Sequence, residues 1–383
     1  MDFTLKKTQV DIQKAALGFA KGEFDKDAAE NMDKAMLFPK DILEKAGELG
    51  FIGIHFPDKY MGGGLGYLEL ALTAEAFCRK DAGIGAALML SGFASECLLK
   101  GGEETLKKKY LSKISEGKML SGAAFYEKES GADLGLIQTT ALKTKDGYVI
   151  NGEKTHAVNA GLAGLYLVLC KTDTNAAPDK ALSLFAVEAD RSGLCTCAPK
   201  EKLGLRMIAS ADIVFDHVEI PEINLIGKEG GGLKLIEGFF GEFRLLVAAM
   251  ALGAARGALD RALTHIRERI QFGRKIGEFQ VTRHKIADMA QKIESAAYIT
   301  YAAAKNLEQK KPDPSLSAMA RLTATDAAAY VTSESIQLLG GYGYMTEYEV
   351  ERFYRDVKAM TVMAETPGRL KDEVAGGIIG KLK

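Results

Sequence analysis

Hydrophobic and polar positions along this chain form three successive blocks. Apolar residues recur at helical spacing from Thr8 to Ala20, from Asp41 to Leu49 and from Leu68 to Phe77. Between Met119 and about Phe215 the pattern changes to short β-type runs, and after Gly230-Gly231-Gly232 long helical patterns continue to the end. Because helices, strands and helices follow in blocks, the pattern predicts separated layers rather than an alternating βαβ sheet.

Four runs in the middle block predict strands, and two Gly-containing dipeptides predict turns. The strand runs are Tyr148–Ile150, Tyr166–Leu169, Leu182–Val187 and Ile213–Phe215. Asp146-Gly147 and Asn151-Gly152 are typical of hairpin turns, because both residues tolerate a positive φ.

Two apolar segments predict buried helices. Residues from Gly83 to Leu99 are small and apolar except for Ser91, Ser95 and Glu96, so this helix should be largely buried. The most apolar run, Leu245 to Ala255, is interrupted by Gly253 and ends at Arg256. It is shorter than the ~18 apolar residues that span a bilayer. The sequence therefore predicts a protein without a membrane anchor.

Charge and cysteine content exclude several classes of function. The chain has 50 basic and 51 acidic residues, so it has no overall attraction for nucleic acid or an anionic membrane. Of the five cysteines, Cys195 and Cys197 lie closer together than zinc ligands usually do, and no metal site is predicted. Met1-Asp2-Phe3 begins the chain without a hydrophobic signal region. We expect a soluble cytoplasmic protein with reduced thiols.

Two stretches of the last block carry the strongest motifs. One reads Gln337-Leu338-Leu339-Gly340-Gly341-Tyr342-Gly343-Tyr344 and follows an apolar helical pattern from Ala327 to Leu339. By itself the glycine pair is more often a helix C-cap than a phosphate site. About 60 residues upstream, Arg269-Ile270-Gln271-Phe272-Gly273 leads to Phe279-Gln280 between two long helical patterns.

In this order and spacing, the two stretches resemble the FAD-binding signatures of the acyl-CoA dehydrogenase family. The resemblance implies an α+β, mainly α fold with an N-terminal helical domain (residues 1–118), a middle β domain (119–228) and a C-terminal four-helix bundle (229–383). It also implies a homotetramer that oxidises an acyl-CoA and passes electrons to an electron-transferring flavoprotein. The residues matching the adenosine diphosphate site of FAD are Arg269, Gln271, Phe272 and Gln280, with Gln337, Leu338, Gly340 and Gly341 supplied by a neighbouring subunit.

Residues matching the flavin-ring and substrate sites depart from the family pattern. Phe125, Tyr126, His156, Val158 and Thr366 match positions around the flavin. Tyr126 replaces a small hydroxyl residue, His156 replaces a tryptophan, and Val158 replaces a hydroxyl residue. His156 either tunes the flavin or relays protons, or it simply fills the tryptophan's place. Ser91, Ala132 and Arg244 match the acyl-pocket helix, a position near the thioester, and the arginine near the pantetheine arm.

The family's catalytic carboxylate is absent from both of its usual positions. Ala364 and Phe243 occupy them. A shifted loop or helix could present Glu365 or Glu242 as the base, which must be a carboxylate in a water-poor pocket. Alternatively the base has moved to Glu96 on the N-terminal helix, as in relatives acting on alicyclic CoA thioesters.

The sequence therefore predicts an FAD-dependent dehydrogenase of a compact or alicyclic acyl-CoA with a relocated base. The alternative is a non-catalytic or modified-chemistry flavoprotein subunit of a heteromeric acyl-CoA dehydrogenase. The sequence leaves both interpretations open.

Overall fold

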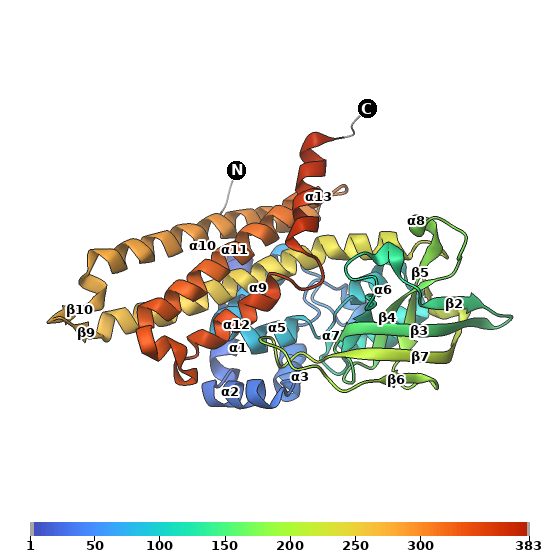
Figure 1. Ribbon diagram of the computed structural model, residues 1–383, viewed down its shortest axis with the longest axis horizontal. Helices are drawn as coiled ribbons and strands as arrows, with labels where there is room; N and C mark the ends of the chain where they lie inside the picture. Colours follow the sequence, from blue (N-terminus) through green and yellow to red (C-terminus); the bar gives the residue numbers. More distant parts are fainter. Residues whose placement is uncertain (1–3, 381–383) are drawn as a thin grey trace.

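The computed structural model describes residues 4–380, so Met1 to Phe3 lie outside the described residues. Figure 1 shows the arrangement, with a long helical bundle at one end of the molecule and a sheet at the other. The N-terminal block is helical, and its first helices begin at local caps; for example, the Asp25 side chain accepts a 2.8 Å hydrogen bond from the Ala28 amide. The helices are α1 (Lys7–Glu23), α2 (Lys26–Ala35), α3 (Lys40–Glu48), α4 (Tyr67–Lys80), α5 (Ala82–Met89), α6 (Ser95–Gly101) and α7 (Glu104–Ser115).

The single helix predicted from Gly83 to Leu99 is wrong, because the chain breaks between α5 and α6. The backbone turns at this break, with Ala94 at φ 64°. Ser91 there accepts a 2.9 Å bond from the Ser121 amide, and Gly92 forms a parallel bridge to the same residue. The break ties the N-terminal helices to the first strand of the sheet, a contact that helical periodicity does not reveal.

The middle block forms one mixed sheet with the strand order β6-β7-β3-β1-β4-β5-β8, and β2 pairs with β3 and β4. Strands β1 and β4 run parallel, while β3 pairs antiparallel with β7 over most of its length. The strands are β1 (Ser121–Ala124), β2 (Thr140–Lys143), β3 (Gly147–Val158), β4 (Leu165–Lys171), β5 (Leu182–Glu188), β6 (Leu194–Thr196), β7 (Ser210–Pro221) and β8 (Leu225–Ile226).

Strand β3 corrects one turn prediction. Asp146-Gly147 does lie at the β2–β3 connection, where the Thr144 amide donates to the Gly147 carbonyl. Asn151-Gly152, predicted as a second turn, lies inside β3, and the register to β7 shifts at this point. An irregularity of this kind bends a strand without ending it.

The C-terminal block consists of long helices: α9 (Gly232–Glu268), α10 (Gln280–Leu307), α11 (Pro314–Leu339), α12 (Val350–Met360) and α13 (Pro367–Ile379). Helix α9 continues through Gly253 and Arg256, beyond the apolar run that ends before Arg256. A Cβ at Gly253 would lie 2.3 Å from the Glu75 carbonyl oxygen, so glycine allows α9 to approach α4 closely. Gly340 caps α11 with φ 62°, in agreement with the C-cap interpretation.

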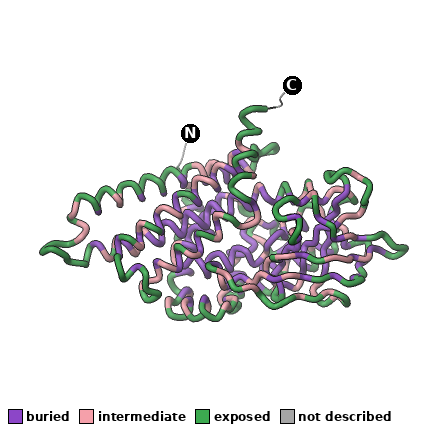
Figure 2. Tube along the Cα trace, viewed as in Figure 1, coloured by how far each residue is buried: buried purple, intermediate pink, exposed green. Residues whose placement is uncertain are grey.

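Between α9 and α10 lies a short hairpin of β9 (Ile270–Gln271) and β10 (Arg274–Lys275). Its turn residues Phe272 and Gly273 both have positive φ, as a tight hairpin turn requires. Figure 2 shows buried backbone concentrated where α9 meets the N-terminal helices and the sheet, while this hairpin and the end of α13 are exposed. None of the helices within residues 4–380 is long and apolar enough to cross a membrane.

Candidate active site

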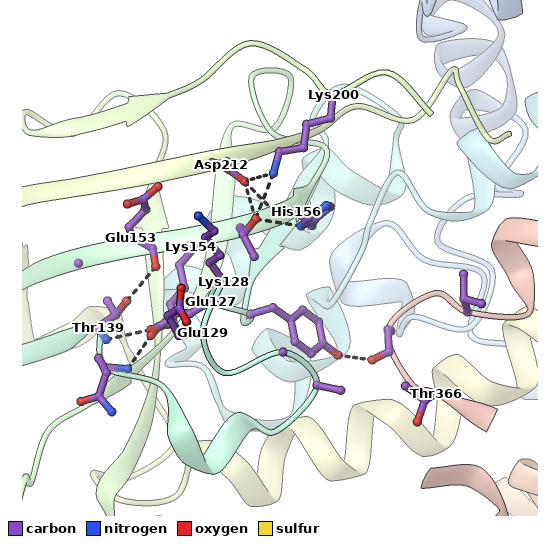
Figure 3. A pocket seen from close by; sticks show the side chains of 18 residues that line it. Glu127, Lys128, Glu129, Thr139, Glu153, Lys154, His156, Lys200, Asp212 and Thr366 are labelled. Atoms are coloured by element: carbon purple, nitrogen blue, oxygen red, sulfur yellow. Dashed lines mark hydrogen bonds and ion pairs between the residues drawn. The ribbon is translucent and has the colours of Figure 1, made fainter. Parts of the chain in front are cut away.

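A pocket of about 980 Å³ lies between the sheet and the loop that joins α12 to α13. Strand β3 supplies Lys154, Thr155 and His156 to its wall, and the loop supplies Ala364 and Thr366. Figure 3 shows His156, Asp212 and Lys200 gathered on one side of the pocket and Thr366 on the opposite side. The pocket therefore contains three of the residues predicted around the flavin: Tyr126, His156 and Thr366.

A buried ion pair forms part of the pocket wall. The Lys154 side chain is fully buried and lies 2.9 Å from Glu127 Oε1. The Glu127 carboxylate also accepts hydrogen bonds from the Gln138 and Thr139 amides. Burial alone would raise the pKa of Glu127, but Lys154 and these hydrogen bonds outweigh it and lower the pKa. Burial lowers the pKa of Lys154. The pair fixes β3 against the segment that follows Tyr126.

Strand β3 has a second bulge at Thr155 and His156, where its register to β7 shifts again. His156 has φ 52°, and its amide donates to Asp212 Oδ1 over 3.2 Å. Asp212 also lies 2.7 Å from Lys200, and hydrogen bonds from Lys200 and Thr155 lower its pKa to about 2. This network holds the bulge open toward the pocket and orients His156 into it.

The Tyr126 phenol links the sheet to the α12–α13 loop across the pocket. Its hydroxyl donates a 2.6 Å hydrogen bond to the Ala364 carbonyl. Burial, with Glu365 nearby, raises the pKa of Tyr126, so the phenol keeps its proton. Ala364 has φ 61°, which turns its side chain toward the pocket. Phe125, the neighbour of Tyr126, is buried behind the pocket wall, and Val158 lies at the end of β3 outside it.

Glu365 points away from the pocket. Its side chain is 1 % exposed and forms a bidentate pair with Arg244, with N–O distances of 2.8 and 2.7 Å. Arg321 lies 3.8 Å and Arg369 lies 3.4 Å from the same carboxylate. Ala364 and Thr366 on either side of Glu365 both line the pocket. Successive side chains of this loop therefore alternate between the pocket and the arginines.

The other two carboxylate candidates lie apart from the pocket and from Glu365. Glu242 on α9 accepts a 2.6 Å hydrogen bond from Tyr67 and pairs with Lys100, and burial raises its pKa. Glu96 on α6 lies 3.4 Å from the His55 imidazole in the N-terminal domain. None of the three predicted carboxylates lines the 980 Å³ pocket.

The residues predicted to contact substrate are also dispersed. Ala132 lines the pocket. The Ser91 hydroxyl donates to the Leu88 carbonyl inside the N-terminal domain, over 2.7 Å. Arg244 is buried, and its Nε and Nη2 are bonded to Glu365. Although burial opposes it, this pairing raises the pKa of Arg244.

An aromatic cluster fills the space beyond Tyr126. Phe93, at the α5–α6 break, lies edge-on to Phe239 and Phe243 of α9, with ring centroids 5.2 and 5.1 Å apart. Phe125 extends the cluster toward Tyr126, at 6.5 Å from both Tyr126 and Phe239. All four phenylalanines are buried. The apolar helix expected to line an acyl pocket is therefore packed against α9 by aromatic rings.

The residues that match the adenosine diphosphate site lie at the opposite end of the molecule, around the β9–β10 hairpin (Figure 1). The Arg269 guanidinium lies 5.4 Å from the Tyr342 ring, so the hairpin base and the glycine loop are neighbours in one chain. Gln271, Gln280 and Gln337 are exposed, Leu338 is buried, and Phe272 is 92 % exposed.

This end of the molecule fits a diphosphate group. A Cβ at Gly340 or Gly341 would meet no atom within 4 Å, which leaves their backbone open to a ligand. Arginine and amide side chains supply the donors that a pyrophosphate needs. For a flavin whose ring occupies the pocket beside the sheet, both sets of residues would have to come from a partner subunit.

Several residues of the site escaped sequence reasoning. Glu127 follows Tyr126 directly and Lys154 lies two residues before His156, and their opposite charges beside a strand were a usable signal. No sequence signal pointed to Asp212, Lys200 or Arg321. Only the sheet register and the packing of α11 bring these residues to their partners. Within residues 4–380, no group of three or more His, Cys, Asp or Glu side chains is placed to hold a metal.

Comparisons with known proteins find similarity to one family along nearly the whole chain. Sequence profiles of the acyl-CoA dehydrogenase N-terminal, middle and C-terminal domains match residues 6–118, 122–218 and 230–378. The chain is 35 % identical to an acyl-CoA dehydrogenase of Bacillus subtilis, over 94 % of each chain. It is 33 % identical to the caffeyl-CoA reductase–Etf complex subunit CarC of Acetobacterium woodii, over 97 % of each. The solved butyryl-CoA dehydrogenase of Megasphaera elsdenii superposes with a TM-score of 0.94 at 31 % identity, covering 99 % of this chain and 100 % of that one.

Proposed function

Because this chain belongs to the acyl-CoA dehydrogenase family, whose members bind FAD, we propose that it is a dehydrogenase of compact acyl-CoA thioesters, alicyclic ones included. The α+β fold predicted from the sequence is confirmed by the same family and by the solved relatives.

The single observation that supports a compact substrate is the aromatic packing beyond the pocket. Phe93, Phe239 and Phe243 occupy the space between the acyl-pocket helix and α9. A long alkyl chain would have to displace these rings, and each buried aromatic side chain contributes several kcal/mol to packing, about 3–5 on truncation. Tyr126 narrows the pocket further through its hydrogen bond to the Ala364 carbonyl.

A bound FAD would supply the hydride acceptor for the β carbon of the acyl group. The chain's own residues hold the thioester and exclude water. In our proposal Tyr126, His156 and Thr366 surround the ring, and the Lys154–Glu127 pair fixes the wall that carries them. The α proton lacks a carboxylate acceptor at position 364, so dehydrogenation of ordinary straight-chain substrates should be slow.

Among the three candidate bases, Glu365 is the one whose sequence neighbours, Ala364 and Thr366, line the pocket. Accepting a proton there would require it to leave two charge-assisted hydrogen bonds to Arg244. Glu242 and Glu96 would require larger movements, since each belongs to a separate polar cluster. This pairing of all three carboxylates outside the pocket favours a second candidate function, a flavoprotein subunit that does not itself dehydrogenate the substrate.

The separation of the two FAD-binding regions supports a shared cofactor. We propose that a partner subunit supplies both the β9–β10 hairpin and the Gln337–Gly341 loop to each flavin, within a homotetramer. The exposed Phe272 ring is then covered at the interface. An electron-transferring flavoprotein is the proposed electron acceptor, and the name of the A. woodii relative places that protein in a complex with an Etf.

Anaerobic mixing with a panel of CoA thioesters tests the proposal. Loss of the flavin absorbance should be faster with cyclohexanecarboxyl-CoA and butyryl-CoA than with palmitoyl-CoA. Faster loss with palmitoyl-CoA refutes the compact pocket. A protein that holds FAD but is reduced by no thioester favours the second candidate, and co-purification with a Glu-bearing homologue supports it. Sedimentation with and without FAD tests the tetramer.

A further inference from the structure

A second, much smaller chamber lies inside the N-terminal domain, apart from the 980 Å³ pocket. The segment between α3 and α4 supplies His55 to its wall, and the α5–α6 region supplies Ser91, Ser95 and Glu96. Leu246 of α9 forms another part of the wall. The chamber has a volume of about 20 Å³. A cavity needs about 10–15 Å³ to hold one water molecule, so the chamber is large enough for one water.

Three buried polar atoms at this chamber have no hydrogen-bond partner within residues 4–380. They are both ring nitrogens of His55 and Oε2 of Glu96. The His55 side chain is 9 % exposed. Its Nε2 lies 3.4 Å from Glu96 Oε1, beyond the range of about 2.7–3.2 Å for a good hydrogen bond. Leaving such atoms unpaired costs about 1–3 kcal/mol each, so a native chamber of this kind needs a partner for them.

The hydrogen-bonding capacity of the walls identifies that partner. The Ser91 and Ser95 hydroxyls donate to the Leu88 and Gly92 carbonyls, so their oxygens only accept within the chamber. An ionised Glu96 carboxylate also only accepts. A ligand that satisfies these groups must donate two protons, and it must accept from or donate to an imidazole nitrogen.

We propose that this chamber binds one internal water molecule that joins His55 to Glu96. The water donates one proton to Glu96 Oε2 and the other to a serine oxygen, and it accepts the N–H of His55. The ring nitrogen that faces the chamber therefore carries the proton. Buried waters of this type make about three hydrogen bonds, and two of the three here pair Glu96 Oε2 and one of the two His55 ring nitrogens.

The bound water gives Glu96 a structural role. It connects the segment around His55 to α6, whereas the aromatic contacts of His55 are with its neighbour Phe56 and with Tyr67 of α4. Glu242 belongs to a neighbouring network with Tyr67 and Lys100 and does not line the chamber. The inference is independent of the proposed substrate, because it concerns a chamber outside the flavin pocket.

A crystal structure of the FAD-loaded protein, at a resolution that shows ordered waters, tests the site directly. We expect one isolated density peak about 2.7–3.2 Å from a His55 nitrogen and from Glu96 Oε2. An empty chamber overturns the proposal. A peak with the short oxygen contacts and high density of a metal cation also overturns it.

Variants provide a second readout. Glu96→Leu removes the acceptor and should lose the peak and lower Tm by several degrees, while Glu96→Gln keeps an acceptor and should retain both. The matched control is Glu48→Leu, an exposed acid on α3 in the same domain, which should leave Tm unchanged. If Glu96→Leu is as stable as wild type, or if Glu96→Gln loses the peak, the bridging water is refuted.

Discussion

Replacing Glu365 by Gln is the sharpest test of how this site is built. The change keeps the shape of the side chain but removes its charge from a cluster of three arginines. Arg244 then loses its bidentate partner in a place where its own side chain is only 5 % exposed. Arg321, fully buried, loses the carboxylate 3.8 Å away, and burial already lowers its pKa to about 10.

The expected cost follows from this burial. Removing one partner of a buried ion pair typically destabilises a protein by about 3–5 kcal/mol, because the other charge stays buried and unpaired. With a second guanidinium facing the same carboxylate, we expect the upper part of that range. In the unfolding equilibrium this corresponds to a change of roughly 10³–10⁴-fold.

Urea unfolding at fixed protein and FAD concentrations measures the effect, since cofactor binding and assembly both contribute to apparent stability. The control is Glu373→Gln, which removes the other carboxylate near Arg244, 3.6 Å away and 35 % exposed. Because Glu373 is partly exposed and Arg244 keeps Glu365 as its partner, we expect this control to lose about 1 kcal/mol or less. The double variant Arg244→Met with Glu365→Leu should recover part of the loss, because it removes both charges of the pair while Arg321 still lacks its carboxylate.

Two results would contradict this reasoning. If Glu365→Gln unfolds like wild type, the ion pair does not hold the loop. If in addition it abolishes flavin reduction by every thioester, Glu365 is the catalytic base and the carboxylate must leave Arg244 during turnover.

Three further predictions follow from particular residues. Ala364→Glu places a carboxylate at the pocket wall and should raise the rate of flavin reduction by butyryl-CoA, up to the ~10²–10⁴-fold that a positioned base contributes. Ala364→Gln is the control. Equal rates for the two variants would refute the role of a carboxylate at this position. Burial raises the pKa of Asp356 from 3.8 to about 7. A carboxyl whose folded pKa is raised does not reduce the free energy of unfolding below pH 3.8, and it reduces this free energy progressively as pH rises to about 7. The free energy of unfolding of Asp356→Asn, measured in urea titrations, should therefore rise relative to wild type by up to about 4 kcal/mol across that window. Parallel pH profiles for the two proteins would rule this out. Gly253→Ala should lower stability by about 1–3 kcal/mol because its Cβ meets the Glu75 carbonyl, whereas Gly18→Ala, with no atom within 4 Å, should be neutral or stabilising in the same thermal melts.

Local pattern determined much of this protein. The block order of helices, strands and helices follows from hydrophobic periodicity, which can be read from the sequence without knowing any tertiary contact. The Gly340 cap and the positive-φ turn at Phe272-Gly273 depend on neighbouring residues only. The paired motifs around Arg269 and Gln337 identified the family, because their order and spacing are properties of the sequence alone.

Tertiary structure decided what local pattern could not. The break at Ser91–Ala94 exists because Ser121, about 30 residues later, takes up backbone bonds there. Glu365 and Ala364 are adjacent in sequence, yet one faces an arginine on α9 and the other faces the pocket. That choice depends on the positive φ of Ala364 and on Tyr126, more than 200 residues away, which holds its carbonyl. A carboxylate becomes a base, an ion-pair partner or a water ligand through the groups packed around it, and those contacts form only when the chain has folded.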